Sequence, residues 1–251
     1  MTHALDSSQR FAARVVGFGY LLAMATAIFG ESYVRGSLIV NGDAMRTAQN
    51  IAEHRLLFRL GIAGELLTFA SDIALIVALY VILAPIHRHL ALFATAIRLV
   101  AETVCVTMAA HSFDVLRILG GADDMKAFDP EQLAALARVS LGAHGAAYGT
   151  AFVFLGIGSA VFGYLWIRSR YLPLSLGVLG VVAPLLLGGG SFAILMWPGL
   201  NGALYPWFMV PMFFFEVGTG LLLAWRGLRE PAPPEVERWE RRVSGAESTP
   251  A

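Results

Sequence analysis

The stretch that decides the fold is Leu90–Leu119, LALFATAIRLVAETVCVTMAAHSFDVLRIL, which is apolar almost throughout. A helix of ~20 apolar residues, rising ~1.5 Å per residue, crosses a hydrocarbon core of ~30 Å. The stretch nevertheless carries Arg98, Glu102, His111 and Asp114. A charge at bilayer depth costs at least ~2.5–3.5 kcal/mol, so such residues normally face protein or a water-filled cavity. The stretch therefore predicts a membrane span that contributes to an internal polar site.

The composition of the whole chain supports a membrane protein. Of its 251 residues, 57% are hydrophobic and only 14% are charged, whereas globular domains carry about 25% charged residues. The formal net charge is zero, so we predict no nucleic-acid partner. A single cysteine, Cys105, lies inside an apolar segment, which excludes an intramolecular disulfide and a thiolate metal site.

Further apolar segments predict an all-α polytopic integral membrane protein, with six transmembrane helices in one bundle over residues 1–229. The expected spans are residues 11–32, 56–83, 90–119, 138–167, 172–197 and 204–225. The short turn Pro85–His89 predicts an antiparallel hairpin of the second and third spans. Asp129 followed by Pro130 is a helix start, with Asp as the N-cap. Residues 230–251 lack an apolar face and predict a disordered cytoplasmic tail.

The N-terminal segment admits two interpretations. Arg10 and Arg14 before the apolar run Val15–Phe29 resemble a secretory signal peptide, but the apolar sequence continues and favours a retained first span. Basic residues gather at the N-terminus, the second and fourth loops and the C-terminus. By the positive-inside rule we expect both termini in the cytoplasm. Paired glycines such as Gly17-x-Gly19 and Gly177-x-x-Gly180 predict close contacts between helices.

Four ionisable residues in three spans are expected at similar depth: Asp72, Arg98, Glu102 and Glu216. At ~1.5 Å per residue they lie ~12–18 Å from the cytoplasmic ends of their spans. One guanidinium cannot neutralise three carboxylates. Either some carboxyl groups stay protonated, or a cation, a proton pathway or a cationic ligand completes the balance. The alternative is an arginine–carboxylate network that only joins the helices.

A second polar group is expected nearer the outer face, with Tyr148 one helical turn from His144. Histidine and carboxylates suit Zn, Fe or Mn, but no metal-binding motif such as His-Glu-x-x-His is present, and hydrogen bonds between helices explain the same residues. We therefore predict no metal site and no catalytic residue. The weak metal candidates are His111, Asp114, His144, Glu65 and Glu31.

Several blocks of the sequence resemble a known family. They include Ala13–Leu21, Glu31–Ala44, Leu57–Gly61, Phe128–Leu133 and Leu172–Leu179. Together they are similar to the bacterial six-helix membrane proteins grouped as domain of unknown function 4386, from about Ala13 to Gly227. The resemblance implies a six-helix membrane fold and carries no activity, cofactor or catalytic residue. It adds weight to the residues at its motif positions, which are Arg59, Asp72, Arg98, His144 and Glu216.

Three functions remain open from the sequence. The first is the binding or movement of a small molecule, lipid or ion in a bacterial inner (cytoplasmic) membrane. Its site would comprise Asp72, Arg98, Glu102, Glu216, Glu65, Arg59, His144 and Tyr148. The second is a non-catalytic structural or partner-binding component of the lipid bilayer, and the third is an intramembrane, metal-dependent enzyme. A cavity joining the charged residues to one face would favour the first. The sequence predicts neither the cofactor, the ligand nor the oligomeric state.

Overall fold

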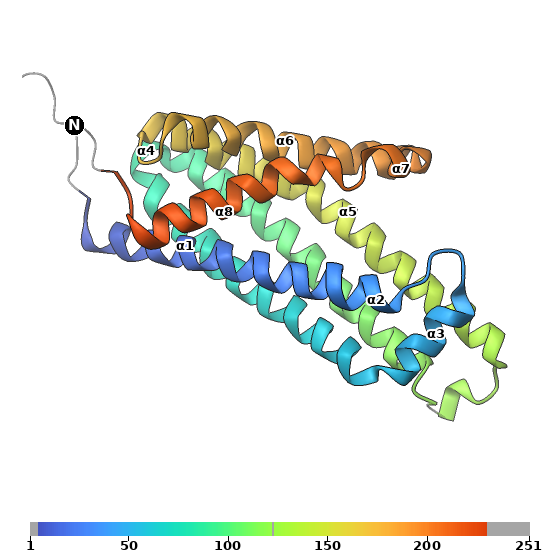
Figure 1. Cartoon of the computed structure of the whole chain (residues 1–251). Helices are drawn as coiled ribbons and strands as arrows, with labels where there is room; N and C mark the ends of the chain where they lie inside the picture. Colours follow the sequence, from blue (N-terminus) through green and yellow to red (C-terminus); the bar gives the residue numbers. More distant parts are fainter. Residues whose placement is uncertain (1–4, 122, 230–251) are drawn as a thin grey trace, which may run out of the picture.

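The computed structural model describes residues 5–121 and 123–229; the predicted tail, residues 230–251, lies outside them. The described residues form helices joined by short connections and contain no strand. In chain order the α-helices are α1 Ser7–Ala27, α2 Gly36–Leu38, α3 Ala44–Glu53, α4 Arg55–Ile118, α5 Pro130–Ser169, α6 Leu174–Met196, α7 Asn201–Leu204 and α8 Val210–Trp225 (Figure 1). A π-helix, Ile28–Arg35, links α1 to α2, and three-residue 3-10 helices lie at Asp123–Met125, Pro198–Leu200 and Trp207–Met209.

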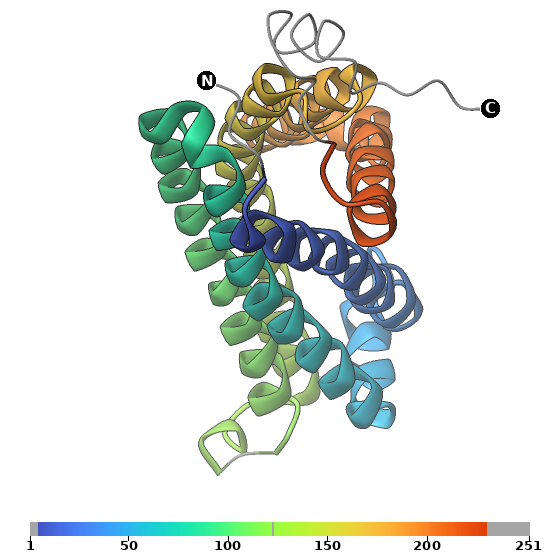
Figure 2. The same ribbon diagram turned by 90° about the vertical axis from the view of Figure 1, so that its left-hand side faces the viewer.

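Five helical segments of the described chain are long and apolar enough to cross a membrane. The longest, α4, is broken at His87, whose backbone has φ −161° and ψ 93°, two residues after Pro85. Proline cannot donate the helical hydrogen bond, which favours a break here. The chain turns back at this point (Figure 2), and Arg55 at the start of α4 donates to the carbonyl of Leu119 after its end (2.6 Å). The two halves of α4 therefore count as two spans, and the predicted all-α, six-helix membrane fold is confirmed.

Side-chain caps define where two of the helices begin. Asp129 accepts a hydrogen bond from the backbone of Gln132, and Gln132 returns one to the backbone of Asp129. This capping box starts α5 at Pro130, as the Asp129-Pro130 sequence predicts, and the helix continues without a break through the expected span 138–167. Asp6 and Gln9 form the same box at the start of α1. Each box satisfies two backbone donors that would otherwise lack partners.

The spanning helices pack as a closed ring. Helix α1 contacts α4 and α8, α4 contacts α5, α5 contacts α6, and α6 contacts α8. Small residues permit the closest approaches: a methyl group on Gly163 of α5 would collide with the backbone of Gly180 on α6, and one on Gly17 of α1 would collide with Ala224 of α8. From this crossing, α1 and α8 diverge toward the other end of the bundle (Figure 1). The ring is therefore tight at one end and wide at the other.

The first span continues beyond its expected end at residue 32. The helix proceeds through the π-helical stretch to Leu38, so the spanning segment is Ser7–Leu38. Val34 and Leu38 are buried together with Ile51 of α3 and Phe58 of α4. This apolar contact covers the end of the bundle and holds the last turn of the first span, including Arg35, inside the protein.

Candidate functional site

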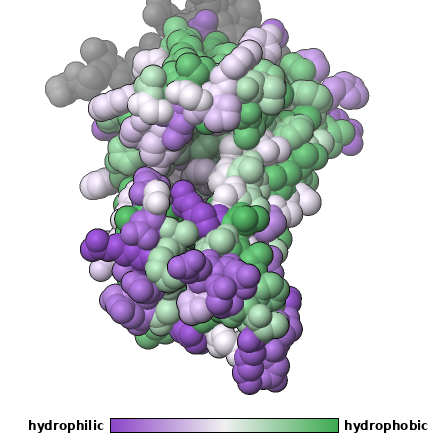
Figure 3. Space-filling model, turned by 90° about the vertical axis from the view of Figure 1, so that its right-hand side faces the viewer, coloured by the Kyte–Doolittle hydropathy of each residue, from purple (hydrophilic) through white to green (hydrophobic). Residues whose placement is uncertain are grey.

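A cavity of about 400 Å³ lies at the wide end of the ring, between the diverging parts of α1 and α8. Its other walls come from α4, α5 and α6, and the exposed residues Ser32 and Tyr205 lie at its edge. Figure 3 shows the molecule hollowed on this side. Among the described residues that line it, none is a lysine, arginine or histidine. Its acidic lining consists of five carboxylic acids: Glu31, Glu65, Asp72, Glu102 and Glu216.

The inner acidic group surrounds Arg98, which is only 2% exposed. The Nη1 of Arg98 donates to Ser159 Oγ of α5 at 2.7 Å. Its Nη2 lies 3.6 Å from Glu102 Oε1 and 4.0 Å from Asp72 Oδ2. Glu216 of α8 lines the same cavity, but makes no ion pair or hydrogen bond with a described residue. One guanidinium thus pairs with two carboxylic acids while a third stays unpaired, and we call Asp72, Arg98, Glu102 and Glu216 the inner group.

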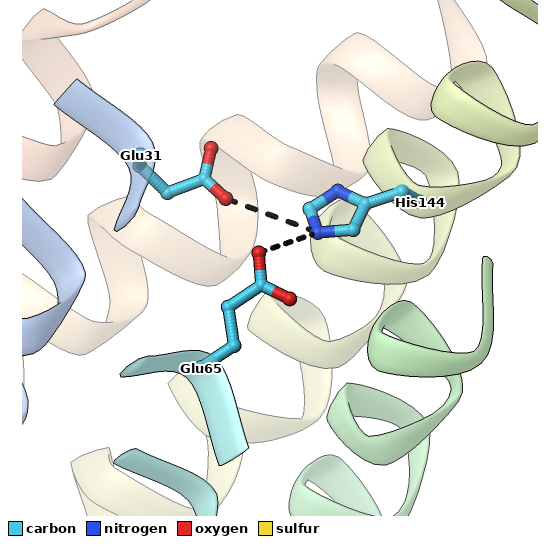
Figure 4. Close-up of side chains that lie close together, drawn as sticks. All are labelled: Glu31, Glu65 and His144. Carbon is cyan, nitrogen blue, oxygen red and sulfur yellow. Dashed lines mark hydrogen bonds and ion pairs between the residues drawn. The ribbon is translucent and has the colours of Figure 1, made fainter. Parts of the chain in front are cut away.

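The outer acidic group surrounds Arg35, at the end of the π-helix. The Nε of Arg35 lies 3.2 Å from Glu31 Oε1 and 3.4 Å from Glu65 Oε1, and its Nη2 donates to Ser112 Oγ at 2.9 Å. His144 Nε2 lies 3.2 Å from the same oxygen of Glu65 (Figure 4). We call Glu31, Arg35, Glu65 and His144 the outer group. It joins the first span, the first half of α4 and α5, and the bond from Arg35 to Ser112 connects it to the second half of α4.

A mainly apolar belt separates the two groups along the cavity. The hydroxyls of Thr26 and Thr68, which also line it, hydrogen-bond to each other at 2.6 Å. Phe69 of α4 is buried with Cys105 and Met108 from the returning half of that helix, and Tyr148 of α5 packs against them. The Tyr148 ring stacks over His144, with centroids 6.4 Å apart, and contacts Phe152 at 4.2 Å. All of these except His144 line the cavity. The belt is therefore an aromatic and thioether surface between two acidic ends.

The structure brings together most of the residues that the sequence singled out, though not all. Asp72, Arg98 and Glu102 meet, Glu216 faces the same cavity, and Glu65, His144 and Tyr148 lie at its outer end. Arg59 lies elsewhere: it is exposed on α4 and forms no ion pair with a described residue. The structure does not bring Arg59 to the cavity, because the buried face of this helix runs through Phe58 and Ile62 instead.

The weak metal candidates are divided between two places. Glu31, Glu65 and His144 offer ligand atoms that lie within 4.8 Å of one another. His111 and Asp114 do not belong to this group and pair with each other at 4.0 Å on a more exposed face. Carboxylate and imidazole ligands suit several divalent ions, but the Arg35 guanidinium already contacts both carboxylates. A metal ion at these oxygens would have to displace it.

Three residues of the site were not identified from the sequence. Arg35 was expected at the end of the first span, yet its side chain is buried; Ser112 and Ser159 hold the two arginines. The signal available for Arg35 was its spacing of four from Glu31, the spacing of an ion pair on one helix face. No feature of the neighbouring sequence identifies the two serines as site residues, because their role depends on which arginine faces them from another helix.

Comparison with known proteins agrees with the fold and adds no activity. A family model described as "Domain of unknown function (DUF4386)" matches residues 15–227. No curated protein matches the chain, and no solved structure matches it. The match covers both halves of α4 and every residue of the inner and outer groups.

Proposed function

The chain belongs to the DUF4386 family, whose description assigns no activity, and we propose from its cavity that it is a multi-pass membrane protein that binds a small cationic molecule. The observation that carries the proposal is the lining: five carboxylic acids and no basic residue among the described side chains. The volume, about 400 Å³, falls within the ~300–1,000 Å³ of typical small-molecule sites.

The charge balance favours a cation over an anionic or neutral ligand. The five acids face the two guanidinium groups of Arg35 and Arg98, which lie behind the lining. Buried charges are tolerated when they are paired, and here carboxylic acids outnumber fixed cations by three, with His144 as the one neighbouring titratable base. A positively charged ligand would supply the missing partner. Aromatic rings on the wall, such as Tyr148 and Phe152, offer their π-faces to the same charge.

A purely structural network remains the competing explanation, and the cavity argues against it. Arginine–carboxylate pairs that only joined helices would need no adjoining space. Glu216 in particular pairs with no described residue, yet it lines the cavity. An enzyme has less support, because none of the described groups forms the contact between a nucleophile and a base that covalent catalysis needs.

For the cellular setting, we infer a bacterial inner membrane with both termini in the cytoplasm. The basis is the distribution of basic residues in the sequence. In this orientation the lipid bilayer surrounds the ring, and the wide end of the ring faces the outer side. The ligand would then enter from outside the cell or from the outer leaflet.

Thermal unfolding of the full chain in detergent tests cation binding. Propylammonium should raise the melting temperature, whereas propionate and propanol at equal concentration and ionic strength should not, because only the amine pairs with carboxylates. Glu216→Gln should reduce the response without destabilising the free protein, since Glu216 makes no ion pair with a described residue. The matched control is Glu53→Gln, at an exposed glutamate of α3 outside the cavity. Equal effects of the three solutes, or an unchanged response of Glu216→Gln, would contradict the proposal.

A further inference from the structure

The acids of the cavity lie in two groups with an apolar belt between them. The outer end carries Glu31 and Glu65, and the inner end carries Asp72, Glu102 and Glu216. Resting on the proposed cation binding, we propose that the ligand is a linear diamine or polyamine, held by one ammonium group at each acidic end with its methylene chain along the belt. The lining alone indicates a cationic ligand, and the separation of its acids into two groups indicates a ligand with two cationic ends.

The spacing of the two ends defines the length of such a ligand. Glu65 and Asp72 lie seven residues apart on the first half of α4, nearly two full turns, so both face the same side. At ~1.5 Å per residue they are ~10 Å apart along the helix. An ammonium group lies ~2.8 Å from the carboxylate that it contacts. The two nitrogens should therefore be separated by somewhat less than ~10 Å, which fits a chain of intermediate length.

The charge is distributed to match a ligand with a cation at each end. At the outer end, two carboxylic acids share the one guanidinium of Arg35. At the inner end, Asp72 and Glu102 share Arg98, and Glu216 has no ion-pair partner among the described residues. Counted against the arginines alone, one acid is left over at the outer end, where His144 also contacts Glu65, and two are left over at the inner end. A single metal ion or a monoamine could balance only one of the two.

Unpartnered acceptors occur at both ends. Glu65 Oε2 and Glu102 Oε2 are buried without a hydrogen-bond partner among the described residues. The two residues are 9% and 3% exposed and line the cavity. Buried carboxylate oxygens are normally hydrogen-bonded, and an ammonium group brings three donors. Both oxygens are turned away from the open space of the cavity, so a rotation of each carboxylate toward it would let one ammonium group at each end satisfy them.

The belt between the ends suits a methylene chain. Phe69 lies between Glu65 and Asp72 in the same helix, and Cys105, Met108 and Tyr148 pack beside it. None of these side chains carries a charge, and the thioether and aromatic surfaces are apolar. Each methylene buried there should strengthen binding about fourfold, from ~0.8 kcal/mol per CH₂.

The test is a titration of the full chain in detergent with diamines from diaminoethane to diaminodecane, each compared with the monoamine of the same carbon number. Affinity, measured by calorimetry, should peak between diaminopentane and diaminoheptane. At the peak the diamine should bind at least tenfold more tightly than its monoamine. Glu65→Gln should weaken binding of the diamine at least tenfold more than it weakens binding of the monoamine, because only the diamine needs both ends of the cavity. Glu31→Gln repeats the test should Glu65→Gln fail to fold, and Glu53→Gln is the control.

The outcomes separate this inference from the proposed function. If diamines and monoamines bind equally, or if the affinity of diamines has no optimum of length, the proposal of a linear dication is wrong. The proposal that the cavity binds a cation is not affected by that result. The absence of binding by every amine would overturn both. A diamine optimum that Glu65→Gln and Glu31→Gln leave intact would place the second ammonium group elsewhere and also overturn the inference.

Discussion

Replacing Arg98 by methionine should destabilise the protein by ~3–5 kcal/mol. The side chain is only 2% exposed, donates to Ser159, and lies 3.6 Å from Glu102 and 4.0 Å from Asp72. Methionine retains the length and removes the charge, which leaves both carboxylates buried without their cation. Removal of one partner from a buried ion pair typically costs ~3–5 kcal/mol. At ~2–4 °C per kcal/mol for a chain of this size, the melting temperature should fall by roughly 10 °C.

A double-mutant cycle distinguishes this effect from lost packing. Arg98→Met combined with Glu102→Gln removes one of the stranded charges, so the double variant should recover ~1–3 kcal/mol relative to the single one. Thermal unfolding in detergent, followed by tryptophan fluorescence, gives both values. Arg59→Met, at an exposed arginine of the same helix, should change stability by less than ~0.5 kcal/mol. Equal stability of the single and double variants, or an Arg98→Met no worse than Arg59→Met, would refute the reasoning.

Two further predictions concern the scaffold and use the same unfolding assay. Gly163→Ala should reduce the free energy of unfolding by ~1–3 kcal/mol, because the added methyl group collides with the backbone of Gly180 and forces helices α5 and α6 apart. The control is Gly142→Ala in the same helix, where the space around the residue is open. This variant should be neutral or stabilise the protein by up to ~1 kcal/mol. Asp129→Ala should cost ~1 kcal/mol through loss of the N-cap bond to Gln132, and a cost no greater than that of an exposed loop substitution would show that this cap is unimportant.

The fold could be predicted from the sequence because the bilayer imposes strong local constraints. Long apolar segments have few alternatives to spanning helices, and Pro85 with the short basic turn after it indicated the hairpin. The inner group was also predictable, because Asp72, Arg98 and Glu216 lie at similar depths in separate spans. Depth and charge are properties of one helix at a time, so they can be estimated without knowing how the helices pack.

The outer group was only partly predictable, because it depends on helix rotation. Ser112 faces Arg35, whereas His111, one residue and ~100° away, lies on a more exposed face. A difference of one position therefore decides whether a polar residue joins the site. Arg35 was missed for another reason. It follows the expected end of a span, and nothing in the periodicity of the sequence indicates that the helix continues in π-helical form.

The π-helix connects the geometry of the cavity to its chemistry. Every residue that Ile28–Arg35 contributes to the lining, including Glu31, lies where α1 has left its contact with α8. Segments of π-helix are rare and occur frequently at functional sites, because they give up regular packing. Here the stretch brings both a carboxylate and the balancing guanidinium of Arg35 inward. A regular helix end at residue 32 would have left Arg35 in the loop and Glu65 without its cation, so the outer end of the cavity exists because this irregular turn extends the first span.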